Sequence, residues 1–251
     1  MSFSVDWLSI REPYDHSARS VRLAQRFVSA VGPGAVLDLA GGTGSGARFL
    51  QQHGAGAVTV VDHDPALLEE AARRGHPVHG ADLDALAGLD ALPSCAGVQA
   101  QALIDLVSWD WLDRFVAWVH ARRVPLLVAL TVDGRVRWSP PDPDDEAVQA
   151  AFRAHQALDR GFGPSPGPRA AHELVERLVG RGWAVEQERS DWQVPASDVA
   201  MIDAMVRGTA EAAAVTHARP EVVAAWAERR LAAPPALMVG HVDVLALPPQ
   251  G

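Results

Sequence analysis

The sequence has little of what several enzyme classes and exported proteins require. Its single cysteine, Cys95, excludes an internal disulfide and cannot by itself build a thiolate metal site. Lysine is absent altogether, which excludes Schiff-base formation and amine nucleophiles. We therefore expect neither a disulfide framework nor lysine chemistry, and no metal.

Long apolar runs and positive charge are also scarce. No run approaches the roughly 18 apolar residues that cross a membrane, and residues 1–7 contain neither a basic stretch nor an apolar signal core. The chain has 31 acidic residues against 22 basic ones, a formal net charge of −9, and its basic residues form no long cluster. We therefore expect a cytoplasmic protein with no membrane and no nucleic acid among its partners.

What the chain does contain is a regular alternation of strand and helix patterns. With 251 residues and 48% apolar content, it can bury the core of one large domain. Short apolar runs mark seven expected strands, at 35–39, 57–61, 77–80, 102–108, 125–130, 184–189 and 237–247. The alternation predicts an α/β fold with a doubly wound, mostly parallel seven-stranded sheet.

Helical segments are expected to cover the edge of this sheet where ligands bind, at the carboxyl ends of its strands. Helical periods are predicted at 21–31, 145–159, 197–215 and 220–232, with one more ending near 181. We expect a single domain, 1–251, with an N-terminal lid at 1–32 and helical lid insertions at about 138–168 and 191–233. The pair Asp133-Gly134 predicts the tight turn of a hairpin within 131–138.

A glycine-rich turn follows the first strand. The strand carries Asp38 near its end, and the glycines of 41–46 let the backbone pass close to a ligand at the start of a helix. Asp62 ends the next strand, where a carboxylate can accept hydrogen bonds from ribose hydroxyls. Asp82 follows the third strand and can accept a hydrogen bond from an exocyclic amine such as adenine N6. Together these elements predict a nucleotide-like cofactor.

In this order, the elements resemble the class I S-adenosylmethionine-dependent methyltransferases, over roughly residues 36–130. The resemblance implies that Asp38 helps to hold the amino group of the methionine part and that the loop backbone at Gly42 and Gly44 contacts it. It further implies that Asp62 binds the ribose and Asp82 the adenine. It also implies an antiparallel C-terminal strand at the end of the sheet.

Further positions follow from the same resemblance. Ala40 stands where the family usually has its first glycine, which is tolerable if its φ is negative. Asp105 falls where the family often has an acidic residue on the fourth strand, with Ser108 and Trp109 just beyond it, facing the transfer site.

The segment ahead of the first helix often folds over the cofactor in this family. In this chain it offers Arg11 for a carboxylate and Tyr14 for the sulfonium or the acceptor, while His63 could stack near adenine. The residues predicted to contact the cofactor are Arg11, Tyr14, Asp38, Ala40, Gly42, Gly44, Asp62, His63, Asp82, Leu83 and Ser108.

The expected acceptor site is apolar with a few polar groups. Trp109 and Trp192 could line an acceptor pocket and stabilise a cation through their ring faces, although a tryptophan is more often part of the core. His155 and Asp159 share a helical face, so Asp159 could orient His155 as a general base, with Gln156 beside them. The alternative for this group is a solvent-facing helix end.

The predicted activity is in-line transfer of a methyl group from S-adenosylmethionine to a small-molecule acceptor, releasing S-adenosylhomocysteine. One alternative is a protein that binds this cofactor without methyl transfer, as a scaffold or for other sulfonium chemistry. Another is an NAD-dependent oxidoreductase, although a chain without lysine cannot supply a Tyr-x-x-x-Lys pair. The alanine-rich helices at 197–232 could form the surface of a homodimer.

Overall fold

The computed structural model describes residues 3–85, 88–158 and 163–249. In this part of the chain, eight strands form one sheet in the order β3-β2-β1-β4-β5-β8-β6, and β7 pairs with β8. The strands are β1 (Val36–Leu39), β2 (Val58–Asp62), β3 (Val78–Gly80), β4 (Gly97–Gln101), β5 (Leu126–Ser139), β6 (Ala184–Arg189), β7 (Trp192–Val194) and β8 (Ala236–Leu247). The first five are parallel, and β8 is antiparallel to both β5 and β6. The predicted fold class and its antiparallel C-terminal strand are confirmed.

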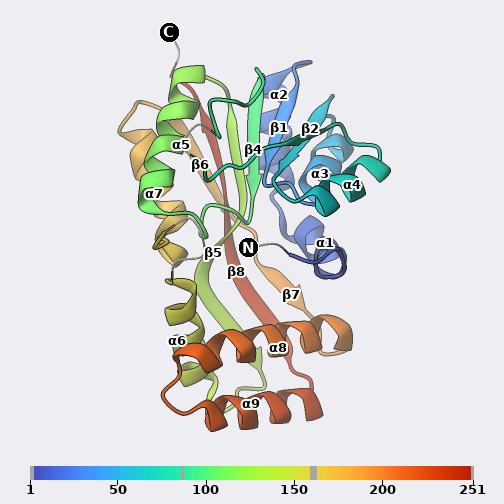
Figure 1. The fold of residues 1–251 in the computed structure, drawn as a ribbon, viewed down its shortest axis with the longest axis vertical. Helices are drawn as coiled ribbons and strands as arrows, with labels where there is room; N and C mark the ends of the chain where they lie inside the picture. The colour runs from blue at the N-terminus through green and yellow to red at the C-terminus, as the bar shows by residue number, and fades with distance from the viewer. Residues whose placement is uncertain (1–2, 86–87, 159–162, 250–251) are drawn as a thin grey trace.

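Helices cover both faces of this sheet (Figure 1). They are α1 (Val5–Ala18), α2 (Val21–Val31), α3 (Ser45–Gln52), α4 (Pro65–Arg73), α5 (Trp109–Arg122), α6 (Asp145–Gln156), α7 (Ala170–Val179), α8 (Val199–Thr216) and α9 (Pro220–Ala232). One core cluster joins α5 and α7 to the sheet, and another joins α2 and α3 to it. Because both faces are covered, β1 and β4 are buried for nearly their whole length.

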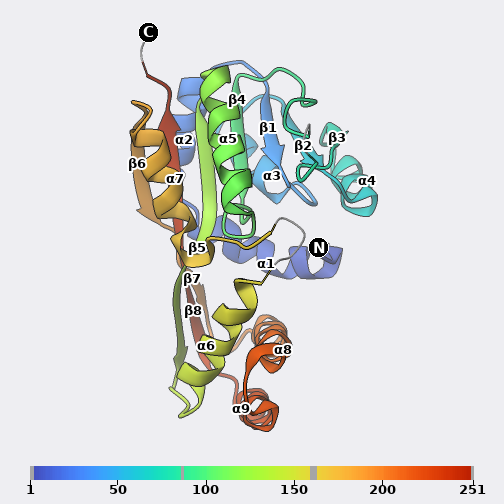
Figure 2. The same ribbon diagram turned by 60° about the vertical axis from the view of Figure 1, so that its left-hand side comes forward.

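The strands β5 and β8 are much longer than the others and continue beyond the parallel sheet. Their extensions, with β7, α6, α8 and α9, form a projecting unit that we call the arm (Figures 1 and 2). The arm has a core cluster of its own, in which Trp138 of β5 meets Trp226 of α9 edge to face with ring centroids 5.6 Å apart. These apolar contacts hold α6, α8 and α9 against the extensions of β5 and β8.

Three expectations about the elements were wrong. The fourth strand is β4, ahead of residues 102–108, and that apolar segment is irregular chain whose side chains are buried beneath α5. No hairpin forms around Gly134, because β5 continues through this residue and pairs with the long strand β8, with a bulge between Val132 and Val136. The segment at 11–15, expected to precede the first helix, lies inside an additional helix, α1.

The short strand β7 is an addition to the seven expected strands, and it pairs with β8 at the junction of sheet and arm. Its three residues are too few for a periodicity to show in the sequence. Within the described residues, no helix is long and apolar enough to cross a membrane.

Candidate functional site

Backbone strain is concentrated where the parallel strands end. Ala40 follows β1 and Ala102 follows β4, with φ of 51° and 49°, and Leu130 lies at a bulge of β5 with φ of 54°. All three line the cavities described below. Positive φ is costly for residues other than glycine, and such strain tends to occur at functional sites. The condition under which alanine would be tolerable at position 40, a negative φ, is not met, and the strain itself points to this edge of the sheet.

A cavity of about 260 Å³, which we call the loop cavity, opens at this edge. Its walls include the glycine turn at 40–43 together with Asp38, Asp62 and Asp82, which come from three neighbouring strands. The predicted residues His63 and Leu83 also line it. The sheet order brings these side chains together because the carboxyl ends of β1, β2 and β3 meet along one edge.

Asp38 lies at the floor of the loop cavity and is fully buried. Gln99 donates a hydrogen bond from Nε2 to its Oδ1 over 2.8 Å, while its Oδ2 has no hydrogen-bond partner among the described residues. Burial raises the pKa of Asp38 to about 6. A Cβ on Gly41 or on Gly46 would lie 2.8 Å from Oδ2, so the glycine turn packs closely against this oxygen and neither position has room for a larger residue.

Arg19 supplies a buried positive charge near Asp38. Its guanidinium donates hydrogen bonds to Gln99 and, over 3.0 Å, to Gln101, and it lies over the ring of Phe49 at 4.2 Å. Gln99 thus connects Arg19 to Asp38 through one amide. Gln99 and Gln101 were missed in the sequence because the fourth strand was placed after them. Two glutamines at alternate positions, and so on one face of a short strand, could have indicated these hydrogen-bond partners.

Asp62 is held by the backbone around it. Its Oδ2 accepts a hydrogen bond from Gly42 N at 2.9 Å, and its Oδ1 accepts one from Asp64 N at 3.0 Å. Gly42 has a φ of 56°, which glycine adopts without strain. Asp82 is exposed, and its Oδ1 accepts a hydrogen bond from Asp84 N at 3.0 Å. Both carboxylates are therefore oriented by their own loops before any ligand binds.

The helix α1 lies between the parallel part of the sheet and the arm (Figure 2), and its residues Leu8, Arg11 and Asp15 line the loop cavity. Arg11 lines the cavity and pairs with Asp15, with 3.1 Å between Arg11 Nε and Asp15 Oδ2. Asp15 also accepts hydrogen bonds from Gln101 at 2.9 Å and from the indole of Trp192 at 3.1 Å. Asp15 thus ties α1 to both β4 and β7.

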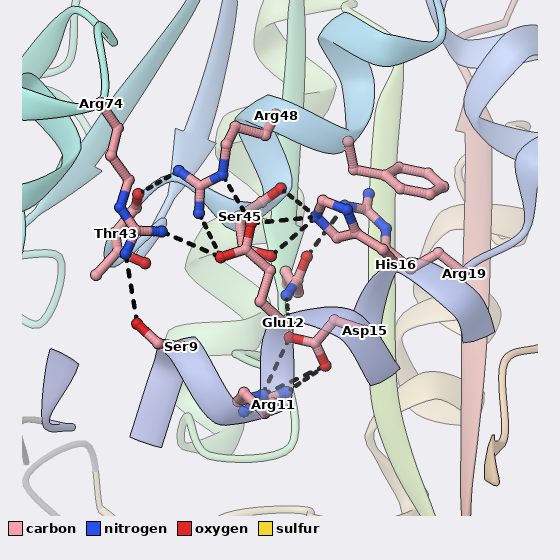
Figure 3. Close-up of polar contacts among 12 residues, drawn as sticks. Ser9, Arg11, Glu12, Asp15, His16, Arg19, Thr43, Ser45, Arg48 and Arg74 are labelled. Atoms are coloured by element: carbon pink, nitrogen blue, oxygen red, sulfur yellow. Dashed lines mark hydrogen bonds and ion pairs between the residues drawn. The ribbon is translucent and has the colours of Figure 1, made fainter. Parts of the chain in front are cut away.

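Polar contacts fix α1 against the glycine turn as well (Figure 3). Glu12 accepts hydrogen bonds from Arg48 of α3 at 2.6 and 2.7 Å and from Arg74, which follows α4, at 3.2 Å. His16 lies 3.1 Å from the carbonyl oxygen of Ser45. The N-terminal segment is therefore a docked helix that forms part of the cavity wall.

A second and larger cavity, of about 680 Å³, lies between α1, the sheet edge and the arm. We call it the arm chamber. It shares Phe3, Arg11, Ala102 and Leu106 with the loop cavity, so these four residues border both spaces, and we call them the neck. The predicted acceptor residues His155, Gln156 and Trp192 line the arm chamber.

Several predicted residues lie elsewhere. Tyr14 donates a hydrogen bond from its hydroxyl to Asp198 at the start of α8. The hydroxyl of Ser108 accepts one from Trp111 N and caps α5. Trp109 packs under Arg169 of η1 (Gly167–Arg169), with 5.0 Å from the guanidinium carbon to the ring centroid.

The described residues that line the two cavities do not include Tyr14, Ser108 or Trp109. They do not include Gly44 either, which is the N-cap of α3. Asp159 lies outside the described residues. The helix-face pairing predicted for His155 and Asp159 therefore stays a prediction.

Comparison with solved structures shows which fold this is. A protein from Bacillus halodurans C-125 described as a candidate methyltransferase matches with a TM-score of 0.53 and 14% identity, covering 92% of this chain and 99% of that one. The YcgJ protein from Bacillus subtilis matches with a TM-score of 0.56 and 13% identity over 92% and 98%. This is the class I methyltransferase fold.

The same fold also occurs in the [4+2]-cyclase SpnF, which matches with a TM-score of 0.50 and 18% identity over 92% of this chain and 81% of that one. No protein-family model matches the chain, and no curated protein matches it either. The class I methyltransferase fold therefore rests on tertiary structure, and the reaction has to be argued from the site.

Proposed function

We propose that this chain is an S-adenosylmethionine-dependent methyltransferase that acts on a small molecule. One observation carries the proposal: the carboxylates of Asp38, Asp62 and Asp82, from three neighbouring strand ends, line a single cavity beside the glycine turn. A cofactor with an amino group, a ribose and an adenine offers each of them a partner. The methyltransferase fold of the solved neighbours is consistent with this proposal.

The chain's own residues fit such a cofactor. Asp38 lines the loop cavity, and its unpartnered Oδ2 can accept a hydrogen bond from an ammonium group. Asp62 can accept from ribose hydroxyls and Asp82 from the adenine amine. When bound, the cofactor would supply a methyl group on a positively charged sulfur. A nucleophilic acceptor atom would attack the methyl carbon in line, and the sulfur would leave as part of S-adenosylhomocysteine.

The arm chamber is the proposed acceptor site. An acceptor in it would reach the loop cavity through the neck at Phe3, Arg11, Ala102 and Leu106. Much of the rate enhancement would come from alignment across this neck, because proximity of two bound reactants can lower a barrier by roughly 7–11 kcal/mol. His155, which lines the chamber, remains our proposed base for an acceptor that loses a proton.

Two other readings make different predictions for turnover. A cofactor-binding protein with other chemistry, on the same fold as the cyclase SpnF, would bind S-adenosylmethionine without forming S-adenosylhomocysteine. An NAD-dependent oxidoreductase would bind the nicotinamide cofactor instead. The second reading gives no role to the buried Asp38 or to Asp82 at the cavity wall.

The test is calorimetric titration with S-adenosylmethionine, S-adenosylhomocysteine, NAD and NADP. We expect the first two to bind wild type, Asp62→Ala to weaken both, and the control Asp110→Ala to leave both unchanged. Asp110 is an exposed carboxylate in the first turn of α5, away from both cavities. Binding of NAD or NADP in place of the sulfonium pair, or of none of the four, would overturn the proposal.

A further inference from the structure

The walls of the arm chamber are largely apolar and aromatic. The strands and α1 contribute Trp7, Leu130, Val132, Val136, Trp138, Trp192 and Val239, and the helices of the arm contribute Phe152, Ala204, Met205, Ala212 and Val215. Apolar walls with a few polar groups are usual for sites that bind small organic molecules, and about 680 Å³ is within the size range of such sites.

Gly208 is the unexpected residue in this wall. It lies in the middle of α8, where glycine is among the least favourable residues for a helix. A Cβ added to it would meet no atom within 4 Å, so close packing inside the protein does not require the glycine. Its neighbours one helical turn away on the same face, Ala204 and Ala212, are also small and line the chamber. This face of α8 leaves space that protein atoms do not fill.

Two of the cations in the chamber wall are neutralised by the protein itself. Arg135 pairs with Asp191, with 2.6 and 2.9 Å between its guanidinium nitrogens and the carboxylate oxygens, and it also pairs with Asp133. Arg11 pairs with Asp15. These two cations therefore offer little free charge to a ligand.

The other polar groups of the wall are of two kinds. Arg153 and Glu211 are exposed, so water can solvate them. Deeper in the wall, His241 is buried, and burial lowers its pKa to about 4, so its ring is neutral near pH 7. Gln149 Oε1 and Trp138 Nε1 are buried without a hydrogen-bond partner in the described part of the chain. These three buried polar groups of the wall are therefore neutral.

The chamber offers little to an anionic ligand. Of the three arginines that line it, Arg11 and Arg135 are paired with carboxylates and Arg153 is exposed. A carboxylate or phosphate brought into this largely apolar space would therefore lose hydration without gaining a buried counter-charge from these arginines, which is unfavourable.

We propose that the arm chamber binds the methyl acceptor, that this acceptor is an uncharged molecule with a fused ring system, and that Gly208 provides the room for its rings. The inference rests on the proposed function for the role of acceptor. The binding of uncharged rings rests on the chamber alone.

The test uses 2-naphthol as an uncharged two-ring probe and 2-naphthoate as an anion with the same rings. Binding is followed by quenching of tryptophan fluorescence, in wild type, Gly208→Phe and Gly208→Ala. We expect 2-naphthol to bind wild type at least about tenfold more tightly than 2-naphthoate, because burying the carboxylate costs its hydration. We expect Gly208→Phe to weaken 2-naphthol by about tenfold or more by filling the space, and Gly208→Ala to change it less than about twofold.

Titration of the same three proteins with S-adenosylmethionine separates the two proposals. Unchanged cofactor binding in Gly208→Phe shows that the variant is folded and that only the chamber is blocked. Equal binding of 2-naphthol by Gly208→Phe and wild type, preferred binding of 2-naphthoate, or no binding of 2-naphthol by wild type would each overturn the chamber assignment. If 2-naphthol follows the expected pattern but S-adenosylmethionine does not bind, the proposed function is overturned, and the chamber remains a site for uncharged rings.

Discussion

Replacement of Asp38 by asparagine is expected to change stability in a pH-dependent way. The folded protein raises the pKa of this carboxyl group from 3.8 to about 6 through burial, which means that the folded state disfavours the charged form. Below pH 3.8 the group is protonated in both the folded and the unfolded state, and the charge costs nothing. The cost grows as the pH rises from 3.8 to about 6 and is complete above that range.

The size of the effect follows from the same values. A rise from 3.8 to about 6 corresponds to about 3 kcal/mol of folding free energy above pH 6. Asparagine carries no charge, and its side-chain oxygen can keep the hydrogen bond from Gln99. The substitution also removes a negative charge that interacts with the buried Arg19, so about 3 kcal/mol is an upper limit for the gain in folding free energy. At about 2–4 °C of melting temperature per kcal/mol, Asp38→Asn gains at most about 6–12 °C at pH 8 relative to acid pH.

The assay is thermal unfolding of wild type and Asp38→Asn from pH 4 to pH 8 without ligand. Any packing cost of the asparagine is independent of pH, so the diagnostic quantity is how the difference between the two melting temperatures changes with pH. We expect the difference to move in favour of the variant as the pH rises. The control is Asp203→Asn, since the hydrogen bond from Arg207 lowers the pKa of that exposed carboxylate and gives a small trend of opposite sign. A difference for Asp38→Asn that does not vary with pH would refute the reasoning.

Three further predictions concern the strained turn, the helix α8 and the proposed base. Ala40→Gly should raise the melting temperature by up to about 2–4 °C, because glycine relieves about 1 kcal/mol at a φ of 51°; a lower melting temperature would contradict this. Gly208→Ala should stabilise the protein by about 1 kcal/mol in urea unfolding, because alanine has the higher helix propensity and its Cβ would meet no atom within 4 Å; a loss of stability would contradict this. His155→Ala should lower kcat on a hydroxyl acceptor by about 10²–10⁴-fold, with exposed His172→Ala as the control, and full activity would exclude His155 as the base.

Local spacing explains why the cofactor side could be anticipated. The path from Asp38 through the glycine turn, and the positions of Asp62 and Asp82 at the following strand ends, depend on short segments of chain whose order in a parallel sheet is strongly restricted. The fourth strand was predicted too late in the chain because a buried segment that is not a strand follows β4. The apolar side chains at 103–107 pack under α5 as irregular chain and are as hydrophobic as a buried strand, so their pattern does not distinguish the two.

The sequence by itself determined the alternating α/β fold, the sheet class and the acids at the ends of the first three strands, because hydrophobic period, glycines and strand order are local properties. Only the tertiary structure decided how β5 and β8 pair far beyond the sheet, and this pairing builds the arm. Only it showed that Arg11 lies at the neck between the two cavities and that Tyr14 faces Asp198 instead. Such contacts join residues far apart in the chain, and their free energy depends on the packing of whole elements, which no local pattern records.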